Sequence, residues 1–129
     1  MKIMKKIKEN DIFYSRQGIT VFYQVVKVYE SGRVRIREIE KVEKPTECGY
    51  EFLATPLKNK FCPKREISEE DKKYYIDNYI DIIDNDKGAI KLVKFFDDDS
   101  PYISLKGHDY ATLYEGEPVI SNYWYVWMK

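Results

Sequence analysis

The chain has 129 residues, of which 34% are charged and 16% aromatic, with 22 basic and 22 acidic side chains and one histidine. This length predicts a single domain, residues 1–129, with a core large enough to fold without disulfides. The balanced charge excludes a strong overall field toward nucleic acid or membrane, and no apolar run approaches the ~20 residues of a membrane span.

The charges are unevenly distributed along the chain. Residues 1–65 hold fifteen Lys or Arg against eight Asp or Glu, a net charge of +7. Residues 66–129 hold seven against fourteen, a net charge of −7. A bipolar surface would follow only if the halves separate in space, because interleaved strands would mix them.

The N-terminus and the cysteines bear on the compartment. Met1–Lys8 is rich in lysine but has no apolar segment behind it, so we expect no secretory signal. Without such a signal, Cys48 and Cys62 are expected to be reduced thiols. The chain is therefore expected in a cytoplasm.

The first third of the chain predicts successive strands. Asp11–Ser15 is a short strand, Arg16–Gly18 a turn, and Ile19–Glu30 a strand rich in β-branched and aromatic residues. Glu30–Arg33 contains Gly32 and predicts a tight turn. With Arg33 to about Val42 as the next strand, this segment is expected to form a hairpin.

The alternation changes within that third strand. Val34 and Ile36 have one parity, whereas Ile39 shares the parity of three basic residues: Arg33, Arg35 and Arg37. A bulge near Arg37–Glu38 would reset which side of the strand faces the core.

One main helix is predicted over residues 68–84. Ser68 is a favourable N-cap, and three acidic residues follow it in the first turn. Apolar residues then recur at helical spacing: Ile76, Tyr79, Ile80 and Ile83. This stripe predicts a helix whose apolar side covers the core.

Strands are also expected on both sides of the helix. Tyr50–Leu57 is a predicted strand, and residues 89–105 are a second predicted hairpin with a turn at Asp97–Pro101. Gly107–Tyr114 is expected to contain a short helical turn. Val119–Met128 is the predicted last strand. The expected class is α+β: a β-rich, bent antiparallel sheet or small barrel of about six or seven strands, with one helix packed on a side or end.

Parts of the sequence resemble a family of small uncharacterised phage and prophage proteins. Asp11–Ser15 and Phe22–Val26 are similar to its D-I-F-Y-S and F-Y-Q-V-V strings, and Tyr102–Ser104 is similar to part of its C-terminal half. The chain departs from the pattern at Asn10, where the family has Gly, in the shortened link at Arg16–Gly18, and in the 68–84 segment. The resemblance implies a small β-rich phage protein.

Candidate chemical groups are few. Gly107–Asp109 contains His108 beside a carboxylate, but no nucleophile is paired with it. Cys48 and Cys62 lack the close spacing of zinc ligands. Asp84 and Asp86 lack the spacing of a calcium loop and fit an ordinary turn. We therefore predict no enzyme, no metal site and no cofactor.

Arg33, Arg35 and Arg37 are the main candidate binding residues. Alternate residues on a strand lie ~6.7 Å apart, close to the phosphate spacing of a nucleic-acid strand. These arginines are expected to bind phosphate or an acidic partner, with Tyr23 and Tyr29 available for stacking. The alternative is a solvated face balanced by acidic neighbours.

Two further sets of residues are candidate contact surfaces. Tyr123, Tyr125 and Trp127 share one parity of the last strand, and interfaces are enriched in Tyr and Trp. We expect one face of that strand to fill the core and the other to form a homodimer or partner surface. The second set, Asp97, Asp98 and Asp99, is a candidate acidic contact, with turn chemistry as the alternative.

Three functions follow as hypotheses. The first is a phage-encoded, non-enzymatic accessory protein that binds and inhibits a host protein or ribonucleoprotein, such as an anti-CRISPR-like inhibitor of a nucleic-acid-guided nuclease, in the host cytoplasm. Its acidic stretches would imitate phosphate. The second is direct binding of RNA or single-stranded DNA by the basic strand. The third is a structural or assembly protein of the virion.

Overall fold

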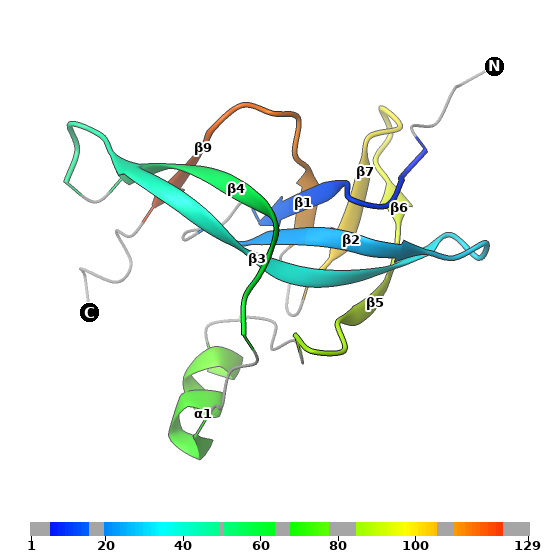
Figure 1. Ribbon diagram of the computed structural model, residues 1–129, viewed down its shortest axis with the longest axis horizontal. Helices are drawn as coiled ribbons and strands as arrows, with labels where there is room; N and C mark the ends of the chain where they lie inside the picture. The colour runs from blue at the N-terminus through cyan, green and yellow to red at the C-terminus, as the bar shows by residue number, and fades with distance from the viewer. Residues whose placement is uncertain are drawn as a thin grey trace.

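A computed structural model describes residues 6–15, 20–49, 51–63, 68–77, 85–105 and 110–122. These residues form nine strands and one helix (Figure 1). The elements are β1 (Ile12–Ser15), β2 (Phe22–Val28), β3 (Arg33–Pro45), β4 (Glu51–Phe61), α1 (Glu69–Asp77), β5 (Ala89–Leu92), β6 (Lys94–Phe95), β7 (Pro101–Ser104), β8 (Tyr110–Leu113) and β9 (Val119–Asn122). No described helix is long and apolar enough to cross a membrane.

All described strands belong to one antiparallel sheet with the order β6-β7-β8-β1-β2-β3-β4-β9, and β5 pairs with β3 outside this path. The predicted β-rich antiparallel sheet is thereby confirmed. It is open rather than a closed barrel, and it has nine strands where six or seven were predicted. The basic and acidic halves of the sequence are interleaved, because β8 pairs with β1, β9 with β4, and β5 with β3.

Strand β3 is the centre of the sheet and the longest strand in the described part. One edge pairs with β2 through residues 34–39. The other edge pairs with β5 through Arg33–Ile36 and with β4 through residues 39–45. Two different strands therefore follow one another along the same edge of β3 (Figure 1).

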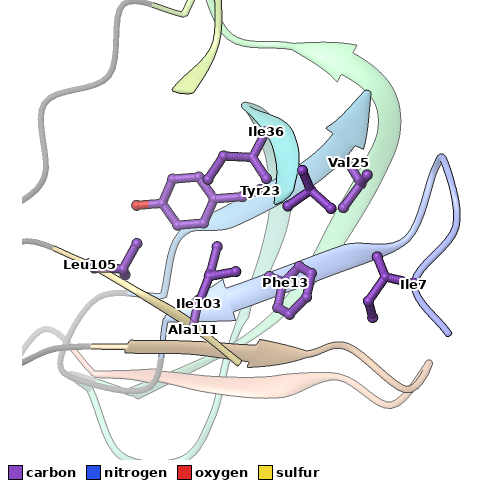
Figure 2. Close-up of a cluster of buried hydrophobic side chains, with 9 residues drawn as sticks. Ile7, Phe13, Tyr23, Val25, Ile36, Ile103, Leu105 and Ala111 are labelled. Atoms are coloured by element: carbon purple, nitrogen blue, oxygen red, sulfur yellow. The ribbon is translucent and has the colours of Figure 1, made fainter. Parts of the chain in front are cut away.

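The sheet buries a separate apolar cluster on each face. The first cluster comprises Ile7, Phe13, Tyr23, Val25, Val34, Ile36, Ile103, Leu105 and Ala111. Figure 2 shows Ile103 and Leu105, from β7 and the residue after it, near Tyr23 and Ile36. Because β7 and β3 are separated by three strands in the sheet order, the sheet must bend around this face.

The second cluster lies on the opposite face. It comprises Ile12, Phe22, Ile39 and Ala54, with Tyr14, Phe61, Tyr114 and Val119 packed against it. The cross-strand pairs Phe13–Tyr23 and Tyr14–Phe22 are adjacent in the β1–β2 ladder, so they lie on opposite faces. Two hydrogen bonds join Thr20, which precedes β2, to β9, one to the Ser121 hydroxyl (2.8 Å) and one to the Ile120 carbonyl (3.1 Å), although β3 and β4 separate these strands in the sheet order.

The two clusters explain the parity change in β3. The predicted bulge near Arg37–Glu38 is wrong, because pairing with β2 is continuous from Phe22–Ile39 to Val25–Ile36. Ile36 belongs to the first cluster and Ile39 to the second. Strand β3 is therefore regular between these two residues. Ile36 and Ile39 are both buried because each face of the sheet has its own apolar cluster. The register shifts lie between Val25 and Lys27 on β2, and between Ile39 and Lys41 on β3.

The helix has a smaller part in the fold than predicted. The Asp71 amide donates to the Ser68 hydroxyl at 3.2 Å, as expected for an N-cap. Helix α1 is described only over Glu69–Asp77, and residues 78–84 lie outside the described residues. Figure 1 shows α1 beyond the end of β4, away from the sheet. Both core clusters consist of residues from strands and their adjoining segments, so a main helix covering the core is not confirmed.

Residues 110–113 also differ from expectation. They form strand β8 instead of part of a helical turn, and β8 pairs with both β1 and β7. Ala111 is fully buried in the first cluster between these neighbours. Two-sided pairing and burial override the weak local preference.

Candidate acidic binding groove

The predicted arginine ladder lies on β3, and its members have different surroundings. Arg33 is exposed. Arg35 donates from Nε to the Tyr29 hydroxyl at 3.1 Å and from Nη1 to the Lys87 carbonyl at 2.7 Å. Arg37 donates from Nε to the Asn85 carbonyl at 2.7 Å, and its guanidinium lies 4.1 Å from the centre of the Phe61 ring. Two of the three arginines therefore hold the turn that precedes β5.

That turn, residues 85–88, is called here the Asn85 corner together with the residues it bonds to: Arg35, Arg37, Glu38 and Cys62. Asn85 is 4% exposed, and its amide group donates to the carbonyls of Glu38 (3.0 Å) and Cys62 (2.5 Å). Its side-chain oxygen accepts from the Glu38 amide at 2.6 Å. Gly88 has a φ of +78°, and an added Cβ would meet the Ile36 carbonyl oxygen at 2.6 Å. The corner is a closely packed polar joint with its hydrogen bonds made inside the protein.

An open groove of about 640 Å³ lies on the face of the second cluster. It is called here the acidic groove. Tyr14 on β1 and Thr112 on β8, which are cross-strand partners, belong to its lining. The turn between β6 and β7 contributes Phe96, Asp98 and Asp99. The segment after β8 contributes Tyr114, Glu115 and Glu117.

The electrostatics of the groove are one-sided. Four carboxylates line it, Asp98, Asp99, Glu115 and Glu117, and no described lining residue is basic. None of the four forms an ion pair with a cation of the described chain. Such a concave surface with one sign of charge attracts ligands of the opposite sign. The groove therefore favours a cation.

The two acidic segments have defined conformations. Asp99 has a φ of 66°, and its amide donates to the Phe96 carbonyl at 2.9 Å. The side chain and backbone of Ser100 lower the pKa of Asp98, and the Ser100 amide donates to its carboxylate at 3.0 Å. Asp98 thus stays ionised throughout the neutral range.

Aromatic rings give the groove an apolar part. The Tyr114 ring packs edge-on against Tyr14 (6.2 Å between centroids) and Phe22 (5.6 Å). Burial, and then the charge of Glu117, raise the pKa of Tyr114, so its hydroxyl stays protonated at neutral pH. At the other wall, Phe96 stacks on Tyr102 at 4.1 Å. Rings next to carboxylates are a combination that suits organic cations.

Thr112 adds a polar group without a partner. Its hydroxyl oxygen is buried and makes no hydrogen bond. Thr112 has Tyr14 opposite it on β1 and Tyr102 opposite it on β7. A buried hydroxyl left unpaired costs about 1–3 kcal/mol, so the fold carries an unfavourable term within the lining of the groove.

The other predicted site residues are placed as follows. Asp98 and Asp99 of the predicted acidic contact line the groove, and Asp97 is exposed beside them. Tyr123, Tyr125, Trp127 and His108 lie outside the described residues. Cys48 and Cys62 are not joined in a disulfide, and the Cys62 thiol donates to the Glu38 carboxylate at 3.5 Å. No group of three or more candidate metal ligands occurs among the residues that the structure describes.

No family model, curated protein or solved structure matches this chain. The proposed function therefore rests on the geometry and charge of the acidic groove.

The sequence indicated two of the four carboxylates in the groove, Asp98 and Asp99, and no other lining residue. Glu115, Glu117, Tyr14, Tyr114 and Thr112 were not among the predicted site residues. The signal that could have indicated the acidic ones is the net charge of −7 in residues 66–129. The aromatic wall depends on pairing between β1 and β8, which no local pattern reports.

Proposed function

We propose that this chain is a non-enzymatic binding protein that engages a basic surface of a partner protein through the acidic groove. The observation that carries the proposal is the lining: four carboxylates without a basic residue, beside exposed and half-buried rings. Complementary charge steers association and fixes the register of a complex. The function needs no catalytic group.

The resemblance to phage proteins supports a host component as the partner. Nucleic-acid-guided nucleases hold their guide–target duplex in a positively charged channel. An acidic groove that enters such a channel would compete with phosphate for arginine and lysine side chains. The proposed outcome is inhibition of the nuclease, in the host cytoplasm.

The test is a cleavage assay with a purified guide-loaded nuclease of this type. The wild-type chain is compared with a groove variant that carries Asp98→Asn, Asp99→Asn, Glu115→Gln and Glu117→Gln. A control variant removes four exposed carboxylates elsewhere: Glu9→Gln, Glu30→Gln, Glu47→Gln and Glu70→Gln. We expect the wild type and the control to inhibit and the groove variant to lose at least tenfold in potency. Equal inhibition by all three proteins would contradict the role of the groove, and no inhibition by the wild type would contradict this partner class.

Direct binding of RNA or single-stranded DNA is the second candidate, and one observation favours it. Lys27 on β2 is the cross-strand partner of Arg35, so two like charges face each other. Lys27 also lies over the Tyr29 ring at 5.2 Å. A basic and aromatic patch thus lies at the end of the β2–β3 hairpin. Oligonucleotide binding that is lost in Lys27→Ala but kept in the groove variant would favour this function.

A further inference from the structure

The acidic groove combines three chemical features, and each discriminates between cations. Its carboxylates come from two separate segments, the turn between β6 and β7 and the segment directly after β8. Its rings include Tyr14, Phe96 and Tyr114. Thr112, whose buried hydroxyl oxygen makes no hydrogen bond, also belongs to the lining.

The rings separate arginine from lysine. A lysine ammonium is compact and strongly hydrated, and it loses that hydration when it approaches an apolar wall. A guanidinium is planar and weakly hydrated, and it stacks on aromatic faces. Phe96, 38% exposed, presents such a surface at one wall.

The acceptors favour the same choice. A guanidinium has five N–H donors in a rigid fork that fits carboxylates in pairs. The groove offers Asp98 and Asp99 on one segment and Glu115 and Glu117 on the other. Thr112 has a further acceptor, the buried hydroxyl oxygen that makes no hydrogen bond within the protein. A donor on the ligand would then remove the cost of its unpaired oxygen.

From these features we infer that the acidic groove is a receptor for arginine side chains, selecting arginine over lysine at equal charge. The inference rests on the proposed function and names the chemical group that the groove holds. It does not depend on which partner supplies that group.

The experiment uses two fluorescent peptides that differ only in three residues, arginine in one and lysine in the other, separated by glycines. Affinities for the full chain are measured by anisotropy at fixed salt. We expect the arginine peptide to bind about fivefold more tightly. The groove variant with four neutralised carboxylates should bind neither peptide, whereas the control variant should bind as the wild type does.

Two variants test the groups that give the preference. Thr112→Val keeps the shape of the side chain and removes the hydroxyl, so it should weaken the arginine peptide and leave the lysine peptide unchanged. Tyr114→Leu should remove the preference, and Tyr114→Phe should restore it because the ring remains. Thermal melting confirms that each variant is folded, and the comparison of the two peptides on the wild type decides the question if Tyr114→Leu is not.

The outcomes separate this inference from the proposed function. Equal affinity for both peptides, lost in the groove variant, would overturn selection of arginine while leaving a groove that binds basic partners. No binding of either peptide to the wild type would overturn the inference. The proposed function would then be tested separately by the nuclease cleavage assay. A Thr112→Val variant that binds both peptides as the wild type does would show that the Thr112 hydroxyl does not accept a hydrogen bond from the arginine.

Discussion

The Asn85 corner and the acidic groove are both built from polar side chains in turns beside the sheet, and they differ in where those groups find partners. In the corner, the buried Asn85 side chain donates hydrogen bonds to two backbone carbonyls and accepts one from a backbone amide. Arg35 and Arg37 each donate to a backbone carbonyl of the turn. In the groove, four carboxylates share a concave surface with no described cation, and the Thr112 oxygen has no partner.

This difference distinguishes two sets of charges that were both candidate binding residues in the sequence. The arginines look like a ligand site there, but Arg35 and Arg37 hold the chain together. Asp98 and Asp99 fit ordinary turn chemistry there, and in the structure they both form the turn and line a concave surface. A charged group that already has internal partners contributes mainly to stability. One left without an opposite charge is available for a ligand.

Gly88→Ala should have the largest effect on stability. The residue must adopt a φ of +78°, and its Cβ would lie 2.6 Å from the Ile36 carbonyl oxygen. We expect a loss of about 3–4 kcal/mol in the free energy of unfolding. Gly116→Ala, in the segment between β8 and β9, is the matched control: its φ is +102°, but nothing lies within 4 Å of the added Cβ. It should cost about 1–2 kcal/mol. Equal losses in urea denaturation would show that the corner is not closely packed.

Asn85→Ala should follow. The substitution leaves the Glu38 amide and the Cys62 carbonyl without the bonds that Asn85 provides, which predicts a loss of about 2–3 kcal/mol. Lys87→Ala in the same turn keeps the carbonyl that Arg35 uses and should stay within about 0.5 kcal/mol. An Asn85→Ala protein as stable as the Lys87→Ala protein would contradict the view of the corner as a structural joint.

The arginines should separate by position. Arg37→Ala removes a hydrogen bond to Asn85 and the contact with the Phe61 ring, so we expect a loss of about 1–2 kcal/mol. Arg33→Ala, at an exposed position of the same strand, should change stability by less than about 0.5 kcal/mol. Equal effects of the two substitutions would contradict a structural role for Arg37 and would support the alternative that all three arginines lie on one solvated face.

The four groove substitutions should have the smallest effect on folding. Neutralising Asp98, Asp99, Glu115 and Glu117 removes like charges from one surface, and asparagine tolerates the positive φ of Asp99. The melting temperature should stay the same or rise slightly. A sharp fall would show that these carboxylates have structural partners, as the corner residues do.

Local patterns predicted the parts of the fold that depend on neighbouring residues. The hairpin of β2 and β3 follows from alternation and the turn at Gly32, which has a φ of 82°. The N-cap at Ser68 follows from the residue type. The β-rich antiparallel class follows from the number of such segments.

Non-local pairing was beyond these patterns. A parity change at Ile39 is produced equally by a bulge or by a second core on the other face, and only the contacts of Phe22 and Ala54 decide between them. The burial of Asn85 depends on Glu38 and Cys62, which are distant in the chain. The groove likewise depends on the pairing of Tyr14 with Thr112, so its acidic residues could be noted but not brought together.

The central claim, that basic ligands bind in the acidic groove and not on the arginine strand, is tested most directly by NMR. The ¹⁵N–¹H spectrum of the full chain is recorded during titration with the arginine peptide. The account predicts shifts concentrated at the amides of residues 98–100 and 112–117, with those of residues 33–38 and 85–88 unchanged. Shifts that concentrate on residues 33–38, or a spectrum that does not respond to the peptide, would contradict it.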